Sequence, residues 1–373
     1  MDINLELLEK QLNNKSKHTN KDDNPYRSVI CLYDFFCLNN TKICEKIKEN
    51  YNLTNRYHII NSCHPISIGE ISDKIYHYNT NNSNNTNNTN NTNNTNNTNN
   101  TNNTNNSNKY VLLQYNKVEH LYFDDFLFKL TNPKLFIFHV LDSYSFLLHS
   151  LLKLQQINIC FFNLSIKNVF FCENYKPILQ NFDTSLLLDK CNNIEYFSKM
   201  FDKINDYAYK PIEVHVIFYL IKNNEDSLSF SAIDSICNNF VKNMSILDLF
   251  SQQYRETYYR TSMDCLKKYI NKPKSEIISQ ILTYSNTWDN YELSVLYLHI
   301  LGNVVRFFSL KDTFINKLTN ILSKNIGPDP LKRETIIVSI DNFDRLFYEY
   351  PNWEYINLIS KEKMKNLYYN LLK

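Results

Sequence analysis

Apolar positions along the chain follow helical spacing in some stretches and strand-like spacing in others, and together they predict a mixed α and β protein. Residues 133–156 carry apolar side chains at helical spacing, for example Phe138 and Leu141, which predicts one long helix. Two short apolar runs follow, 168–172 and 177–182, with a polar turn between them. Aromatic and branched residues around a short polar turn predict a β-hairpin. We therefore expect a long helix that leads directly into a hairpin.

The pattern before this helix predicts a smaller set of elements. Residues 28–36 suit a strand or a buried turn, and residues 41–51 suit a helix with Thr41 as its cap. Residues 57–63 and 110–115 read as two further strands. These elements predict a small α and β unit in the first third of the chain.

Two segments lack the apolar residues that a folded unit needs. Residues 1–24 are polar apart from a short amphipathic stretch at 3–12, and we expect them to be mobile. Residues 79–108 form a nearly pure Asn-Asn-Thr repeat. Without apolar anchors this repeat cannot offset the entropy lost on ordering, so we predict that it is disordered.

Net charge and cysteine spacing limit the partners and the cellular compartment that we expect for this chain. Forty basic and thirty-eight acidic residues leave a formal net charge of +2, so no overall field points to nucleic acid or membrane. The nine cysteines are scattered without metal-ligand spacing, which indicates reduced thiols. The polar first residues show no signal-peptide pattern, and we expect no apolar run to reach membrane-spanning length. We therefore expect an intracellular protein that binds neither nucleic acid nor membrane.

The letters from Ile159 to Asp183 resemble the catalytic loop of protein kinases, H-R-D-L-K-P-E-N followed by D-F-G. The match aligns residues of this chain with the catalytic Asp, the loop Lys, the metal-binding Asn and the Asp and Phe of D-F-G. In that order these residues are Asn163, Ser165, Asn168, Asn181 and Phe182.

The residues that carry the chemistry of this motif are changed. In a kinase the loop Asp accepts the substrate proton, and the Asp of D-F-G holds magnesium. Asn163 and Asn181 replace both carboxylates with carboxamides, which cannot act as a carboxylate base and are weaker ligands for a hard cation. Ser165 also removes the loop cation. The resemblance thus implies no catalytic residue, with Asn168 and Asn181 as weak metal candidates and Asn168 as a weak cofactor-binding candidate.

Three later motifs resemble kinase landmarks and occur in the family's order. Residues 209–213 (Y-K-P-I-E) resemble Y-R-x-P-E, residues 288–294 (W-D-N-Y-E-L-S) resemble D-x-W-S-x-G, and residues 329–335 (D-P-L-K-R-E-T) resemble D-P-x-x-R-x-T. The resemblance implies structural roles for four residues: a buried bridge between Glu213 and Arg333, attachment of the loop backbone by Asp289, and packing by Phe182.

Nucleotide binding is expected to be weak. The three glycines, Gly69, Gly302 and Gly327, lie far apart, so the chain has no Gly-rich phosphate loop, and no strand resembles the one that carries the kinase Lys. We therefore expect no cofactor, or at most weak binding of ATP with magnesium.

The resemblance implies an α+β, protein-kinase-like two-lobed fold. Its reduced N-lobe would cover residues 25–115 and its helical C-lobe residues 116–373. Residues 214–287 are longer than the family's spacing and carry helical patterns at 227–250 and 252–269, which predicts a helical insertion.

The motifs are similar to those of divergent kinase-like proteins of large double-stranded DNA viruses. This resemblance implies a pseudokinase that binds or scaffolds a protein partner, in the host cytoplasm or the virion. Two alternatives stay open: an active but divergent serine/threonine kinase, and a viral structural or interaction protein. The residues do not identify the partner.

Overall fold

The structure, a computed structural model, describes residues 26–50, 55–66, 110–172, 174–204, 209–308 and 310–371. They form a mixed α and β fold in which helices dominate and the sheets are small, which confirms the α+β class. The segments expected to be mobile or disordered, 1–24 and 79–108, lie outside these residues. The chain divides into two compact units, Met1–Thr41 with Ile60–Lys117, and Lys42–Ile59 with Val118–Lys373.

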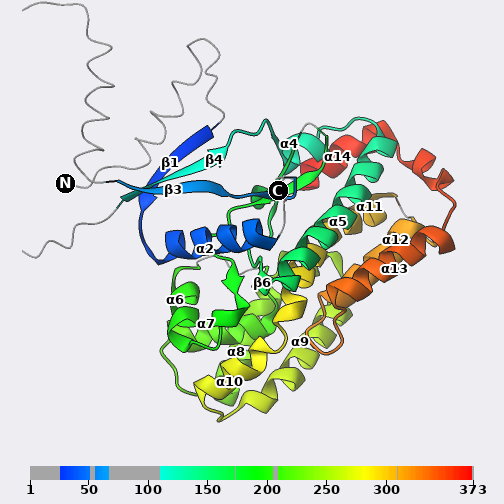
Figure 1. The fold of residues 1–373 in the computed structure, drawn as a ribbon. Coiled ribbons are helices and arrows are strands. Elements are labelled where there is room, and N and C mark those ends of the chain that lie inside the picture. The colour runs from blue at the N-terminus through cyan, green and yellow to red at the C-terminus, as the bar shows by residue number, and fades with distance from the viewer. Residues whose placement is uncertain are drawn as a thin grey trace, which may run out of the picture. The chain divides into compact units, whose positions relative to one another are not determined.

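The smaller unit contains a three-stranded antiparallel sheet. Its strands are β1 (Tyr26–Leu32), β4 (Tyr110–Asn116) and β3 (Ile60–Ile66), in the order β1-β4-β3 (Figure 1). Cys31 of β1 lies opposite Val111, and Cys63 of β3 lies opposite Leu113. Because opposite residues share a face of the sheet, both cysteines lie on the same face as Val111 and Leu113, which are buried.

Helix α2 (Phe35–Asn50) begins six residues before the predicted helix start. Asp34 Oδ1 accepts hydrogen bonds from the amides of Phe36 (3.0 Å) and Cys37 (2.9 Å), so Asp34 caps the helix. Thr41 lies inside the helix and donates to the Cys37 carbonyl at 2.9 Å. The prediction of Thr41 as the cap is therefore wrong, and the strand predicted at 28–36 ends at Leu32.

The larger unit is built on α5 (Pro133–Gln156), which has the bounds predicted from its apolar spacing. Asn132 accepts hydrogen bonds from the first helical amides, and Pro133 occupies a position where a helix tolerates a missing N–H. By length and composition α5 is apolar enough to span a membrane, so the expectation that no run reaches that length is wrong. However, 56% of its most apolar window is buried inside the fold, so much of this apolar surface packs against other parts of the chain.

The predicted hairpin is confirmed as β7 (Val169–Phe171) paired antiparallel with β8 (Pro177–Gln180). These two strands belong to a sheet of order β2-β8-β7-β5, with β2 (Tyr57–His58) and β5 (Leu121–Tyr122) at its edges. The strand predicted at 57–63 is thus two strands, since β2 joins this sheet and β3 joins the other. A separate pair consists of β6 (Ile159–Cys160) and β9 (Leu186–Leu187).

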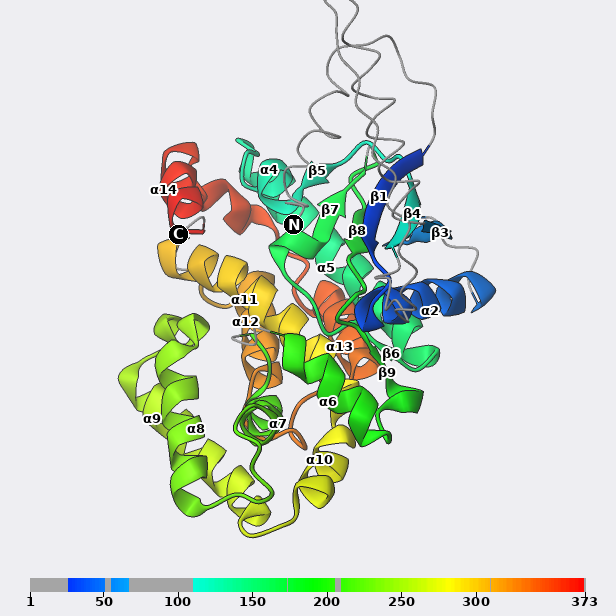
Figure 2. The same ribbon diagram turned by 90° about the vertical axis from the view of Figure 1, so that its left-hand side faces the viewer.

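Helices make up the rest of the larger unit. After the short α4 (Phe123–Leu127) and α5 they are α6 (Ile194–Lys203), α7 (Ile212–Lys222), α8 (Phe230–Asn243), α9 (Gln252–Leu266), α10 (Lys274–Leu282), α11 (Trp288–Phe308), α12 (Phe314–Asn325), α13 (Ile336–Glu349) and α14 (Lys361–Leu371). Helices α7, α8, α9 and α10 group together (Figure 2), and α8 and α9 confirm the helical patterns predicted at 227–250 and 252–269. Helix α11 is buried along most of its length and packs on α5, where Tyr297 donates to Ser143 Oγ at 2.7 Å.

Candidate functional site

The structure brings together the three asparagines singled out in the sequence, Asn163, Asn168 and Asn181. The kinase-like loop joins β6 to β7 and ends in a 3₁₀ turn, Ile166–Asn168. Asn168 Nδ2 donates to the Asn163 carbonyl (2.8 Å), and Asn163 Nδ2 donates to the Asn181 carbonyl (3.0 Å). Asn181 Nδ2 closes the ring with a long contact to Asn168 Oδ1 (3.5 Å). We call these three residues the asparagine ring.

The asparagine ring is neutral, and its members bond to one another. Asn181 has a left-handed backbone (φ 65°), which Asn tolerates better than most residues. Ser165 precedes the 3₁₀ turn, and its carbonyl accepts from the Asn168 amide at 3.1 Å, so it supplies structure and no charge. With carboxamides in place of carboxylates, these residues do not fit a magnesium ion that bridges phosphates.

Phe182, the structural candidate beside Asn181, is buried. Its ring meets the rings of Phe161 (centroids 5.1 Å apart) and Tyr57 (6.1 Å) edge to face. It therefore packs the start of the loop against β2, as expected of a core residue.

Asp289, at the start of α11, holds the backbone of the loop as expected. Its two carboxylate oxygens accept hydrogen bonds from the amides of Phe161 and Phe162, both at 2.9 Å. Cys160 Sγ donates to the same side chain at 3.4 Å. Burial raises the pKa of Asp289, and the two amide hydrogen bonds oppose that rise. The carboxylate is thus used to fix the loop.

A second pair of charges, which the motif match did not identify, holds the next part of the loop. Glu292 lies one turn after Asp289, and its Oε2 accepts from the Leu164 amide at 2.8 Å. Its Oε1 accepts from Lys210 Nζ at 2.7 Å, and Lys210 also donates to the Phe162 carbonyl at 2.6 Å. Both side chains are almost fully buried. We call Asp289, Glu292 and Lys210 the loop clamp.

The loop clamp surrounds a residue with an unfavourable backbone. Phe162 has φ 52°, a left-handed conformation that costs a non-glycine residue about 1–2 kcal/mol. Its amide is held by Asp289 and its carbonyl by Lys210, whose ammonium also lies 4.1 Å from the centroid of the Phe162 ring. These contacts offset the strain and fix the path of the loop.

Burial raises the pKa of Glu292 to about 7, and the neighbouring Lys210 ammonium opposes the rise. Asp289 and Glu292 lie one helical turn apart and are both buried. Because their negative charges are close together inside the fold, a buried cation such as Lys210 is needed to balance them. Lys210 lies within Y-K-P-I-E and Glu292 within W-D-N-Y-E-L-S, but the resemblance assigned a role to neither residue. The sequence signals were a basic residue in the first motif and a second acid three residues after Asp289.

The pairing expected between Glu213 and Arg333 is present. Arg333 Nη2 contacts Glu213 Oε1, both side chains are at most 2% exposed, and Trp288 Nε1 donates to the same oxygen at 3.1 Å. The Arg333 guanidinium also lies 5.4 Å from the centroid of the Tyr291 ring. Within the part of the chain that the structure describes, Glu213 Oε2, Arg333 Nε and Arg333 Nη1 have no hydrogen-bond partner. One nitrogen–oxygen contact therefore joins the Arg333 and Glu213 side chains, and both side chains are buried.

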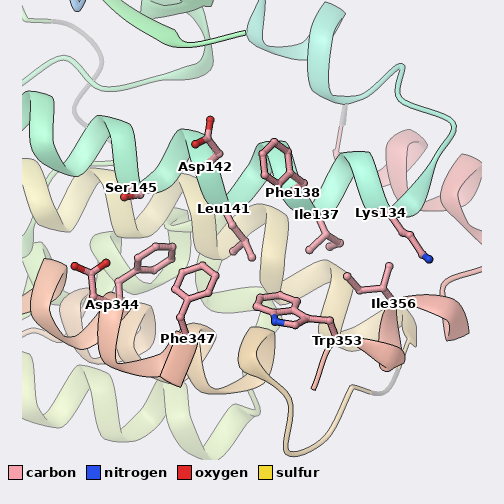
Figure 3. Close-up of a pocket in the computed structure, with 11 residues that line it drawn as sticks. Lys134, Ile137, Phe138, Leu141, Asp142, Ser145, Asp344, Phe347, Trp353 and Ile356 are labelled. Carbon is pink, nitrogen blue, oxygen red and sulfur yellow. The ribbon is translucent and has the colours of Figure 1, made fainter. Parts of the chain in front are cut away.

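A groove of about 420 Å³ lies elsewhere on the larger unit, between α5, α13 and the 3₁₀ turn Glu354–Leu358 (Figure 3). Its apolar lining consists of Ile137, Phe138, Leu141, Phe343, Phe347, Trp353 and Ile356. Phe138 is 60% exposed at the rim. Lys134 and Asp344 lie at opposite ends of the groove (Figure 3), and neither side chain forms an ion pair with any residue that the structure describes.

Comparison with known proteins does not add a family or a relative to this geometry. No protein-family model matches the chain, and no curated protein matches it.

Proposed function

We propose that this chain has a protein-kinase-like two-lobed fold, does not transfer phosphate, and acts by binding a protein partner. The observation that carries the proposal is the asparagine ring beside an intact loop clamp. Carboxamides occupy the positions aligned with the base and the metal-binding Asp, while Asp289 still holds the backbone of the same loop. The loop thus retains the carboxylate that holds its backbone, but it lacks the two carboxylates that a kinase uses in catalysis.

The missing groups account for a large part of the chemistry of a kinase. General-base catalysis contributes about 10²–10⁴-fold to rate, and the metal at the Asp of D-F-G neutralises the developing charge. Asn163 donates its Nδ2 hydrogen to the Asn181 carbonyl, which is the opposite of accepting a substrate proton. Phosphotransfer is therefore expected to be absent.

A radiolabelled ATP assay tests this part of the proposal. Purified full-length chain, with magnesium or manganese and a generic protein substrate, should incorporate no more label than a blank. The variant Asn163→Ala serves as the matched comparison. Metal-dependent labelling that disappears in Asn163→Ala would contradict the proposal.

One observation favours the alternative, an active but divergent kinase. Asp183 places a half-buried carboxylate two residues after Asn181, where its Oδ1 accepts from the Thr184 amide at 2.8 Å. A rearranged loop that used Asp183 as the metal ligand would retain one carboxylate. In the labelling assay this alternative predicts activity that Asp183→Asn abolishes.

The groove on α5 and α13 is the surface that we assign to the partner. Lys134 and Ser145 mark its length along α5, about 16 Å or three helical turns. Its lining is mostly aromatic and aliphatic, and Asp142 of the lining is paired with Lys176. The Lys134 ammonium at one end and the Asp344 carboxylate at the other form no ion pair with the residues that the structure describes. This charge pattern fits an amphipathic helix with an apolar stripe, acidic residues at the Lys134 end and basic residues at the Asp344 end.

A defined probe tests the groove without knowledge of the natural partner. The probe is a labelled synthetic helix of about 14 residues with leucines at i, i+3, i+4 and i+7, glutamates at one end and lysines at the other. Phe138→Asp should weaken binding by about 30-fold, the effect of losing an aromatic contact worth about 2 kcal/mol at the rim of the groove. Phe230→Asp is the matched control, since Phe230 is 56% exposed on α8, outside the groove. Equal binding by both variants, or none by the parent chain, would overturn this assignment.

A further inference from the structure

Three cysteine thiols meet in the smaller unit, although they are scattered in the sequence. Cys31 comes from β1, Cys37 from the first turn of α2, and Cys63 from β3. Cys31 and Cys63 share the buried face of the sheet because they lie opposite Val111 and Leu113. The Cys31 and Cys37 sulfurs are 3.6 Å apart, with Cys31 as the donor, and the Cys63 thiol is close enough to interact with both.

The surroundings of Cys37 favour its thiolate. The hydrogen bond from Cys31 lowers the pKa of the Cys37 thiol, with smaller contributions from Thr41 and Cys63, while burial and the Asp34 carboxylate oppose the shift. Cys37 also lies in the first turn of a 16-residue helix, where the helix dipole stabilises negative charge. The pKa of the Cys31 thiol is raised in turn, so the two thiols differ in role, one as nucleophile and one as proton-bearing neighbour.

We propose that Cys37 is a site of oxidation by hydroperoxides and that Cys31 captures the oxidised sulfur as a Cys31–Cys37 disulfide. The sulfurs need to approach by about 1.5 Å to reach the bond length of about 2.05 Å. The two thiols, one on β1 and one in the first turn of α2, already lie within hydrogen-bonding distance of each other.

The reaction balances with one peroxide. The Cys37 thiolate attacks one oxygen of hydrogen peroxide, the O–O bond breaks, and Cys37 sulfenic acid and hydroxide form. The hydroxide takes up the proton that Cys37 had released and becomes water. Cys31 sulfur then attacks the sulfenic sulfur, and the hydroxyl leaves with the Cys31 proton as a second water. The two thiols lose two electrons, which the peroxide gains.

The position of the two cysteines makes the product easy to identify. Trypsin cleaves after Arg27 and after Lys42, so Cys31 and Cys37 fall in the single peptide Ser28–Lys42. In the disulfide form this peptide takes up no alkylating reagent and is two hydrogens lighter than the reduced, unlabelled peptide. Cys265 is the internal control, because it is more exposed than Cys37 but burial raises the pKa of its thiol.

The experiment exposes the reduced full-length chain to graded hydrogen peroxide, quenches with catalase, alkylates with N-ethylmaleimide and maps the peptides by mass spectrometry. Ser28–Lys42 should lose both labels at a peroxide concentration at least tenfold below that which oxidises Cys265. In Cys31→Ser/Cys63→Ser, Cys37 should instead be trapped by dimedone as the sulfenic acid.

Three results would overturn the proposal. These are oxidation of Cys265 at the same or lower peroxide concentration, retention of both labels on Ser28–Lys42, and a disulfide that joins Cys37 to Cys63, which would exclude Cys31 as the partner. The outcome is independent of whether the chain transfers phosphate.

Discussion

Replacing Lys210 with methionine tests the loop clamp directly. Methionine keeps much of the length and apolar volume of the lysine stem over the Phe162 ring, and it removes the ammonium. Glu292 then loses its 2.7 Å partner, and the Phe162 carbonyl loses its 2.6 Å donor. The variant leaves a buried carboxylate without a counter-charge beside Asp289.

The expected loss of stability is large at alkaline pH. Removing one partner of a buried ion pair costs about 3–5 kcal/mol, because the remaining charge is buried and uncompensated. With a urea m-value of about 3 kcal/mol/M, the unfolding midpoint should fall by about 1–2 M. The left-handed backbone of Phe162 adds to the loss, since its carbonyl is no longer held.

The loss should also depend on pH, with a defined sign. The pKa of Glu292 is raised from its ordinary 4.5 to about 7 in the folded chain. Its contribution to stability is therefore fully present below pH 4.5 and is lost as the pH rises through 7. Lys210→Met removes a group that lowers this pKa, so the pKa rises further. The difference between variant and parent should therefore be largest near pH 8 and shrink toward pH 5, where Glu292 is protonated in both.

Urea unfolding at pH 5 and pH 8, followed by tryptophan fluorescence, measures both effects, because Trp288 is buried beside Phe162. Lys199→Met is the matched control, since its pair with Glu195 is exposed at the surface and should show no measurable shift. The double variant Lys210→Met/Glu292→Gln should recover part of the loss at pH 8. A loss below about 1 kcal/mol, or one of equal size at both pH values, would refute the reasoning.

Three further outcomes are expected. Arg333→Ala should lower the melting temperature sharply, at a cost of about 3–5 kcal/mol, whereas Arg255→Ala, in a partly exposed pair, should leave it unchanged; equal effects would argue against the enclosed bridge. Replacing residues 79–108 with a short Gly/Ser turn should leave the melting temperature unchanged, and a large drop would show that the repeat supports the fold. Asn163→Asp should not raise phosphate labelling above the blank while Asn181 remains a carboxamide, and restored labelling would mean that the base alone was missing.

The sequence predicted the elements whose local pattern agrees with their tertiary role. Helix α5 has an unbroken apolar stripe and a Pro at its first turn, and its predicted bounds are those observed. The pairing of Glu213 with Arg333 and the hold of Asp289 on the loop followed from the order of the motifs. In the last two cases, the charged residue lies within a short motif that the resemblance had already singled out.

Contacts between distant residues had no local signal. Lys210 and Glu292 are 82 positions apart, and nothing in either segment indicates that they meet. The three cysteines of the smaller unit appeared independent, because only the sheet register and the start of α2 bring them together. The start of α2 was misplaced because Phe35 and Phe36 favour a strand by composition, whereas the Asp34 cap extends the helix to include them.

Titration of the chain with ATP, with and without magnesium, tests the central claim most directly. The asparagine ring offers no carboxylate to a metal bridging the phosphates, so the desolvation of the phosphates has little to offset it. Isothermal titration should give a dissociation constant of about 1 mM or no measurable heat, and magnesium should not change it. Micromolar binding that requires magnesium would contradict the account and favour the active kinase.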